Sequence, residues 1–451
     1  MNRYTKAALS ALVPVALLAG CSDWLTGPNL TENPNFPTAA SRDQLLVGVE
    51  TGQTILQTGD LARLLSMWTQ QMAGTDRQYV AFSLYQYDED AFSGDWSAAY
   101  TGGGLIDERG IESNALAAGD TLYAGIGKVM EALTMGTVAD VWGDVPYTYA
   151  VSDSLTPPLD PQQAVYQHVQ SVLDTAITWL ACTASTCQGP TNGADVIYND
   201  NVQYWTELAH TLKARYYLHV EPRMGLTAYD SALAQADSGI SDPSHDFDSY
   251  QSLNPNEWNL WYQFMVVQRS GYISAGDFLV NLLSTTSDPR LARYFAKNSS
   301  GTYLGAPPGG GSGDYSTLSD IRLDPAFHQP MVTYAENQLI KAEAELELGQ
   351  PAAALADYNL ERDSQGVPTS AGPLTLATIM TEKYVALFQE IEPWNDYKRT
   401  CLPALVPAAG SAGIPRRLLY PLSAERNENP HIPAPGSQPT SNWNDPTGAC
   451  P

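Results

Sequence analysis

The stretch that decides the fold is Ala139-Asp140-Val141-Trp142-Gly143-Asp144-Val145-Pro146-Tyr147. Apolar residues at helical spacing precede it, and this pattern stops at Gly143. Gly143 can adopt the left-handed conformation that closes a helix, and Pro146 forces the residue before it into extended geometry. Trp142 and Tyr147 are large enough to anchor both sides of the turn in a core. The stretch therefore predicts a long helix that ends here and is fixed to the protein interior.

Similar helical patterns recur along most of the chain. Ser41-Arg42-Asp43-Gln44 has the form of a capping box and opens either two helices or one broken helix, ending at Gly74. Asp160 followed by Pro161 has the pattern of an N-cap and a first helical residue. Further apolar stripes predict helices over residues 202–218, 229–240, 331–348, 351–359 and 378–388.

Paired helices with little strand signal define the fold class. The patterns indicate roughly eight to ten helices and almost no period-two alternation. Ala342, Ala344, Ala353 and Ala354 suit the close contacts of stacked tetratricopeptide-type hairpins, in which each pair covers the apolar face of the next. We therefore predict an all-α fold of tetratricopeptide-like helix pairs over residues 41–451.

Two stretches break the helical pattern and are predicted to be loop insertions. Residues 75–95 contain many aromatic side chains among polar ones, with no helical period. Residues 241–329 are interrupted by prolines and by the run Gly309-Gly310-Gly311-Ser312-Gly313, although residues 275–283 could form a helix.

The composition limits the class of partner. A net charge of −26 and an isoelectric point near 4.4 disfavour nucleic acid or an anionic membrane surface. Charged residues make up only 16% of the chain, which nevertheless has 25 Tyr and 10 Trp. Exposed aromatic and amide side chains would favour neutral polar ligands; alternatively, many of these rings fill the core.

The N-terminus has the pattern of a lipoprotein export signal. Arg3 and Lys6 precede an apolar run, residues 7–19, which is too short to predict a membrane-spanning helix. The run leads into Leu18-Ala19-Gly20-Cys21, which is similar to a bacterial lipobox. These features predict a signal peptide at residues 1–20, lipid attachment at Cys21 and a turn-rich tether at residues 21–40. Ordinary secretion, with Cys21 free or disulfide-bonded, is the alternative.

Four further cysteines predict two disulfides in an oxidising compartment. Cys182 and Cys187 flank a short polar loop, so we pair them with each other. Cys450, next to the last residue, is paired with Cys401 and would hold the C-terminal tail. A metal site is the rival interpretation, but no histidines cluster nearby at ligand spacing.

The motif content argues against catalysis. The chain has no GxSxG, HExxH, Walker A or GxGxxG pattern, and its six histidines are scattered. The acidic run Asp88-Glu89-Asp90 could belong to a glycosidase or hold Ca²⁺. However, adjacent side chains point apart, and the run lacks an EF-hand pattern. We expect no enzymatic activity, no cofactor and no resident metal.

Several separated motifs together resemble the SusD/RagB family of outer-membrane nutrient-binding lipoproteins. They occur in the family's order along nearly all of the mature chain. Besides the lipobox and the stretch quoted first, they are Trp205 to Arg215, Tyr334 to Ala344, Trp394-Asn395-Asp396-Tyr397-Lys398-Arg399, and Ile414-Pro415-Arg416-Arg417 with Tyr420-Pro421. Lys398 stands where the family usually has a first arginine.

The resemblance implies a tetratricopeptide-like scaffold with a loop-rich ligand region. Such proteins sit as a lid on a SusC-like, TonB-dependent outer-membrane transporter and deliver glycans, or peptides in the RagB branch, to it. This chain would then be lipid-anchored in the outer membrane and surface-exposed. The alternatives are a tetratricopeptide-type scaffold of the cell envelope that binds no nutrient, and a surface glycoside hydrolase.

The same resemblance directs the search for ligand contacts to the two loop insertions, because family members place the ligand site outside the helix stack. A ring face packs against the C–H face of a sugar, while arginine and amide groups serve its hydroxyls. The candidate ligand contacts are Arg77, Tyr79, Tyr85, Tyr87, Trp258, Trp261 and Tyr262, although some could be core residues beneath the loops.

The late family motifs are interpreted as structural. Residues 394–399 and Arg416-Arg417 are expected to form buried locks, since arginine pairs bidentately with carboxylates. Glu336 and Glu343 are expected to pair with such arginines rather than to act as acid and base.

Overall fold

The computed structural model describes residues 40–191, 193–421, 429–434, 436–445 and 450. The predicted signal peptide, the lipid-attachment residue Cys21 and the tether up to residue 39 lie outside the described residues. No helix in the described part is long and apolar enough to cross a bilayer.

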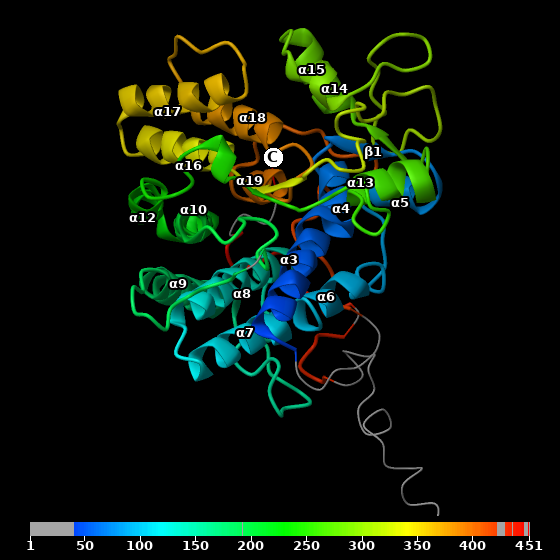
Figure 1. The fold of residues 1–451 in the computed structure, drawn as a ribbon. Coiled ribbons are helices and arrows are strands. Elements are labelled where there is room, and N and C mark those ends of the chain that lie inside the picture. The colour runs from blue at the N-terminus through cyan, green and yellow to red at the C-terminus, as the bar shows by residue number, and fades with distance from the viewer. Residues whose placement is uncertain (1–39, 192, 422–428, 435, 446–449, 451) are drawn as a thin grey trace, which may run out of the picture.

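Helices make up most of the structure, as predicted (Figure 1). The first part of the chain forms α3 (Arg42–Thr58), α4 (Asp60–Trp68), β1 (Met72–Gly74), α5 (Arg77–Ser83), α6 (Ser93–Tyr100), α7 (Leu105–Ala117), α8 (Thr121–Trp142), α9 (Gln162–Leu180) and α10 (Val202–His219). The middle forms α11 (Glu221–Met224), α12 (Leu226–Ala236), a 3₁₀ turn η1 (Pro243–His245), β2 (Phe247–Asp248), α13 (Leu260–Tyr262), a π-helix η2 (Gln263–Gln268), β3 (Ile273–Ala275), α14 (Asp277–Thr285) and α15 (Arg290–Tyr294). The last elements are β4 (Pro330–Val332), α16 (Tyr334–Glu347), α17 (Pro351–Ser364), α18 (Leu376–Ala386) and α19 (Glu392–Thr400).

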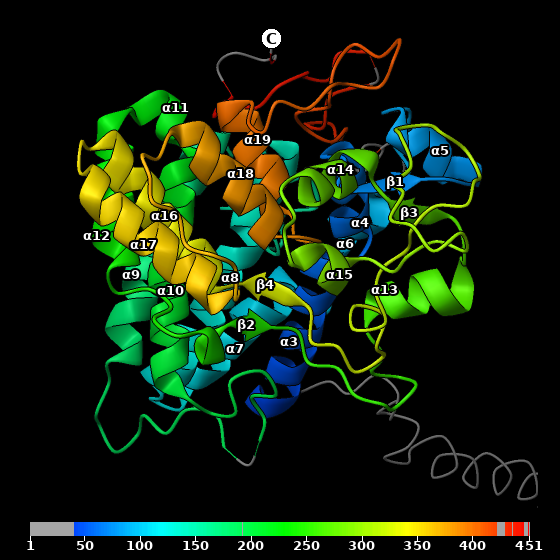
Figure 2. The same ribbon diagram turned by 90° about the horizontal axis from the view of Figure 1, so that it is seen from above.

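The helices stack in sequential pairs on one side of the molecule. Helices α7, α8, α9, α10, α12, α16 and α17 each pack on the next, and α8 is buried along almost its whole length. The shorter elements α5, α13, η2, α14 and α15 lie on the other side (Figures 1 and 2). We call these two parts the helix stack and the loop side.

Two short antiparallel pairs link distant segments. Strand β1 pairs with β3, so that Met72 lies opposite Ala275 and Gly74 opposite Ile273. Strand β2 pairs with β4 just before α16. Strands of two or three residues can join segments but cannot form a sheet core, which agrees with the weak alternation in the sequence.

The stretch quoted first ends a helix as predicted. Helix α8 stops at Trp142, and Gly143 follows with a positive φ of 82°. The Trp142 indole is fully buried and donates from Nε1 to the Leu419 carbonyl at 3.0 Å. Tyr147 is also buried. The turn therefore fixes the end of α8 in the core and to a C-terminal segment.

The predicted cap of α9 was wrong in detail. The Asp160 carboxylate accepts from the backbone N–H groups of Tyr147 and Thr148, both at 2.8 Å, and does not cap α9. Helix α9 starts at Gln162, whose N–H donates to Asp144 Oδ1 at 2.8 Å. An acid distant in sequence therefore performs the role expected of the local one, while Asp160 stabilises the preceding loop.

Other local patterns agree with the structure. Ser41 and Gln44 form a reciprocal capping box at the start of α3. Disulfides join Cys182 to Cys187 and Cys401 to Cys450. The second disulfide holds the chain end against the residue that follows α19.

The two predicted loop insertions contain regular elements. Residues 77–83 form α5, and residues 241–329 include β2, α13, η2, β3, α14 and α15. Helix α5 has only seven residues, so it shows less than two turns of any apolar period. Its start is nevertheless stabilised by the Asp76 carboxylate, which accepts from the Arg77 N–H.

The late motifs form buried locks. The segment 394–399 lies in α19, where Arg399 pairs with the buried Glu343 of α16 through contacts that include Nη2 to Oε2 at 2.6 Å. Arg417 donates from Nη2 to the carbonyl of Trp142 at 2.5 Å. These contacts tie the C-terminal part of the chain to the helix stack, because arginine can satisfy several buried acceptors at once.

Candidate functional site

The loop side brings the two predicted insertions together at one surface. The Tyr79 ring of α5 lies 5.0 Å from that of Phe264 and 6.0 Å from that of Tyr272. The guanidinium carbons of Arg77 and Arg269 lie 5.8 Å and 5.7 Å from the Tyr272 ring centre. We call these five residues the arginine–tyrosine face.

Short backbone links hold this face in place. Besides the β1–β3 pair, the Thr75 N–H donates to the Tyr272 carbonyl at 2.8 Å, and the Thr75 hydroxyl donates to the Gly271 carbonyl at 2.9 Å. Gly74 allows α5 to approach closely, because a Cβ there would lie 1.8 Å from the Tyr79 carbonyl oxygen. The face thus depends on backbone contacts between segments almost two hundred residues apart.

The face combines exposed cations with half-buried rings. Arg77 is 68% exposed, and its nearest acid, Asp76, lies 4.0 Å away. Arg269 is exposed, and Tyr79 and Tyr272 are half-buried. Burial, with a smaller contribution from Asp60, raises the pKa of Tyr79, so its hydroxyl remains protonated at neutral pH. Guanidinium groups can donate to hydroxyl, carbonyl or carboxylate oxygens, and the rings offer apolar contact.

Tyr85 and Tyr87 lie apart from this face. Tyr87 packs its ring 5.4 Å from that of Trp68 and donates its hydroxyl to the Arg417 carbonyl at 3.3 Å. The Tyr85 hydroxyl accepts from the Ala408 N–H at 3.4 Å. Both tyrosines therefore contact the C-terminal segment, and their predicted ligand contact stays a prediction.

The three aromatic residues predicted around α13 have different surroundings. Trp261 is completely buried, so its predicted ligand contact was wrong; it is a core residue beneath the loop. Trp258 is half-buried and packs edge to face on Tyr262, with ring centres 5.4 Å apart. The asparagine cap of α13, Asn259, sets this alternation by accepting from the N–H groups of Trp261 and Tyr262.

Trp258 lines a hollow on the outer side of α3 with a volume of about 370 Å³, which we call the α3 hollow. It is lined by Val47, Glu50, Thr51, Thr54, Ile55, Val196, Ile197, Tyr250, Gln251, Asn256, Glu257, Trp258, Leu260 and Gln263. None of the residues of the arginine–tyrosine face takes part. This volume lies within the range of small-ligand sites, about 300–1,000 Å³.

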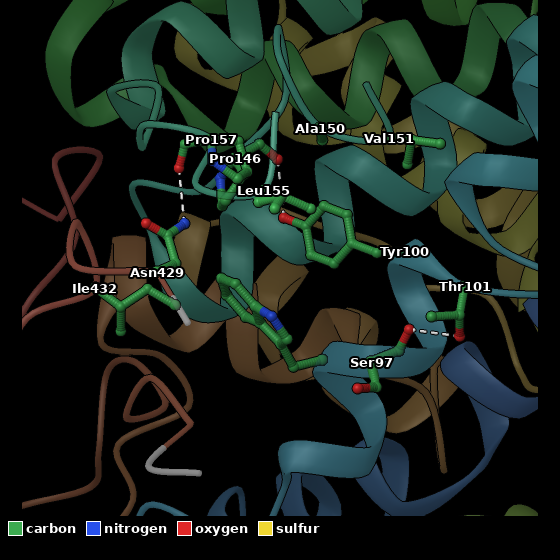
Figure 3. Close-up of a pocket in the computed structure, with 11 residues that line it drawn as sticks. Ser97, Tyr100, Thr101, Pro146, Ala150, Val151, Leu155, Pro157, Asn429 and Ile432 are labelled. Carbon is green, nitrogen blue, oxygen red and sulfur yellow. Dashed lines mark hydrogen bonds between the residues drawn. The ribbon is translucent and has the colours of Figure 1, made fainter. Parts of the chain in front are cut away.

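A second hollow escaped the sequence analysis (Figure 3). It has a volume of about 240 Å³ and lies between α6, the loop after α8 and a C-terminal segment. Figure 3 shows the Tyr100 ring and Ile432 at its walls, with Tyr100 donating to the Pro146 carbonyl and Asn429 to the Pro157 carbonyl. No local signal could have found it, because its walls come from three separate segments, 96–101, 146–157 and 429–432.

A buried cluster of Asp140, His219 and Glu392 has the residue types of a metal site. However, His219 Nδ1 lies 2.8 Å from Asp140 and Nε2 lies 2.8 Å from Glu392. Burial alone would lower the pKa of His219, but the two carboxylates raise it to about 9. Each ring nitrogen thus lies at hydrogen-bond distance from a carboxylate, the arrangement that stabilises a protonated imidazole between two acids. The cluster is an ion-pair bridge between α8, α10 and α19.

Comparisons with solved structures show the fold. A SusD/RagB family protein from Bacteroides thetaiotaomicron is 21% identical, with a TM-score of 0.73 over 87% of this chain and 95% of that chain. A chitin-binding protein is 21% identical, with a TM-score of 0.76 over 90% of this chain and 100% of that chain. A chitin-binding SusD homologue from Flavobacterium johnsoniae is 18% identical, with a TM-score of 0.69 over 88% of this chain and 98% of that chain.

No curated protein matches the chain. Residues 34–361, however, match the model of a SusD-like family described as starch-binding and associating with the outer membrane. That match covers most of the chain and includes α3 through most of α17. The chain therefore belongs to the SusD-like family.

Proposed function

We propose that this protein is a lipid-anchored, non-enzymatic nutrient-binding protein of the outer membrane. It captures a glycan, or a peptide, and delivers it to a SusC-like TonB-dependent transporter. The family's starch-binding description supports the ligand class, as do the chitin-binding proteins among the similar structures. The lipobox-like stretch ending in Cys21 supports the anchor.

The observation that carries the proposal is the arginine–tyrosine face. It presents two exposed guanidinium groups, each within 5.8 Å of the centre of a half-buried tyrosine ring. Such an arrangement can contact a sugar ring or a peptide side chain by its apolar face while donating hydrogen bonds to its edge. Val266 and Val267 of the adjoining π-helix are 45% and 56% exposed and extend the apolar surface.

Binding can be measured by titration calorimetry with maltooligosaccharides, chitooligosaccharides and a mixed peptide panel. For whichever class binds, Arg77→Ala and Tyr272→Ala should each weaken binding at least about tenfold, equivalent to about 1.4 kcal/mol. Tyr149→Ala is the matched control, because that ring is 56% exposed but lies on the loop after α8. Unchanged binding by both face variants would remove the face from the proposal.

Delivery and anchoring need separate experiments. Purification from native outer membranes should recover a barrel-type transporter with the wild-type protein. Labelling cells with a palmitate analogue should mark the wild type and not Cys21→Ser. Protease treatment of intact cells should cleave the protein, whereas a periplasmic tetratricopeptide-type scaffold would be protected. Repeated purification without any barrel partner would contradict the transporter role.

A further inference from the structure

The α3 hollow has ligand-binding features that the arginine–tyrosine face does not share. Its walls include the exposed Tyr250 ring and the half-buried Trp258 ring. Trp258 is fixed by its indole N–H, which donates to the Leu253 carbonyl at 3.2 Å, and by the Tyr262 ring. A ring held in this way offers a flat apolar surface with little loss of conformational entropy on binding.

Polar groups surround these rings without any cation. The lining includes the carboxylates Glu50 and Glu257 and contains no lysine or arginine. Glu257 is held in position by Ser252 Oγ, at 2.5 Å, and by Asn254 Nδ2, at 3.1 Å. Each of its oxygens has a further lone pair available, since a carboxylate can accept about four hydrogen bonds in all.

Glu50 is the buried acid of this lining. Its side chain is buried, with a relative exposure of 1%. Its Oε2 accepts from the Val196 N–H at 3.0 Å, and a further hydrogen bond joins the Glu50 side chain to the neighbouring Asp195. Burial and the neighbouring Asp195 raise the pKa of Glu50 well above its usual range. An ammonium group entering the hollow would stabilise the ionised form of Glu50, which burial and Asp195 disfavour.

The surrounding side chains suit a hydroxylated ring better than an extended peptide. Gln251 and Asn256 place amide groups in the lining, and Thr54 adds a hydroxyl whose proton is already donated to the Glu50 carbonyl. This oxygen can therefore accept from a ligand hydroxyl. We propose that the α3 hollow is a second ligand subsite that holds an amino sugar by its protonated amine, with the sugar ring against Trp258.

The test compares two trisaccharides with the same sugar backbone, one with free amines that can carry a proton and one with neutral acetylated amines. Glucosamine trisaccharide and its fully N-acetylated form are titrated into the whole mature protein at neutral pH and low salt. We expect the amine form to bind at least tenfold more tightly, and added salt to reduce that preference. Glu257→Gln should abolish most of the preference, because it removes the negative charge that attracts the amine. The variant should fold normally, since Glu257 is exposed and the change conserves its shape.

Matched variants separate this subsite from other effects. Asp363→Asn, on the exposed surface of α17, removes one negative charge elsewhere and should leave the preference unchanged. Trp258→Ala should weaken both trisaccharides at this subsite. Glu50→Gln should also reduce the preference for the amine trisaccharide, provided that its melting curve shows a folded protein. If Glu50→Gln does not fold, the result for Glu257→Gln alone tests the subsite.

Three outcomes would overturn the inference. They are equal binding of the two trisaccharides, a preference that survives Glu257→Gln, and tighter binding in the hollow of a lysine-containing tripeptide than of the amine trisaccharide. The arginine–tyrosine face variants Arg77→Ala and Tyr272→Ala should not alter the amine preference. Failure here therefore leaves the proposed nutrient-binding function untouched, and failure of that function leaves this subsite testable.

Discussion

The helix stack and the loop side place arginine in opposite environments. In the stack, Arg215 is buried and pairs through Nη2 with Glu336 Oε2 at 2.5 Å, and Arg399 is buried against Glu343. On the loop side, Arg77 and Arg269 are exposed beside a tyrosine ring. Buried paired arginines hold helices together, whereas exposed arginines beside rings remain available to a ligand. The same residue type therefore has a structural role on one side and, in the function proposed above, a recognition role on the other.

The largest expected effect tests the difference between buried and exposed positions with two tryptophans in and next to α13, Trp261 and Trp258. Trp261→Ala should lower the free energy of unfolding by about 3–5 kcal/mol, because it empties a fully buried site. Trp258→Ala should cost far less stability, since that side chain is only half-buried. Urea denaturation followed by circular dichroism measures both values. Similar losses for the two variants would contradict the assignment of Trp261 to the core and Trp258 to a surface hollow.

The arginine contrast predicts an effect of similar size in the stack and almost none on the loop side. Arg399→Met leaves the buried Glu343 with only Lys383, 3.9 Å away, and should cost about 3–5 kcal/mol. Arg77→Met should change stability by no more than about 0.5 kcal/mol, because it breaks no buried contact. Ligand affinity should show the reverse order. Arg77→Met should bind ligand more weakly than wild type, whereas the folded fraction of Arg399→Met should bind ligand with wild-type affinity.

The histidine bridge should make the helix stack sensitive to alkaline pH. Asp140 and Glu392 raise the pKa of His219 from 6.5 to about 9 despite its burial. The stabilisation is fully present below the ordinary pKa and is lost as pH rises through about 9; its size is on the order of 3 kcal/mol.

Comparing unfolding free energies from pH 6 to 10 in wild type and His219→Gln isolates this contribution. The control matters because Lys398, whose pKa burial lowers to about 8, titrates in the same range with the opposite sign. Loss of the lysine proton in the folded state makes the protein more stable as pH rises above 8. An identical pH slope in both proteins would exclude a charged His219.

The smallest expected effect concerns Tyr87. Tyr87→Phe removes one hydrogen bond to the Arg417 carbonyl and should cost about 0.5–1.5 kcal/mol. Ligand affinity should stay unchanged, because the hydroxyl faces the C-terminal segment. A loss of affinity equal to that of Arg77→Ala, at unchanged stability, would return Tyr87 to the ligand site.

The sequence predicts the helix stack better than the loop side for a physical reason. A helix such as α8 repeats its apolar period over 22 residues and ends in a glycine with a positive φ, so local signals accumulate. Helix α5 is too short to repeat its pattern, and the two tryptophans of the α13 region differ only in which way the chain turns them. The arginine–tyrosine face and the hollow in Figure 3 arise from pairings between distant segments, which no local pattern encodes.

The missing side chain at Gly74 has a consequence for how this protein can change. The carbonyl of Tyr79 occupies the space that any larger residue at position 74 would need, so the gap between β1 and α5 is set by main-chain atoms. Exposed side chains of this region can consequently be exchanged without changing the main-chain contact between β1 and α5. In the proposed function, exchange of Arg77, Val266 or Arg269 would therefore change the ligand preference without moving α5, as long as Gly74 is retained.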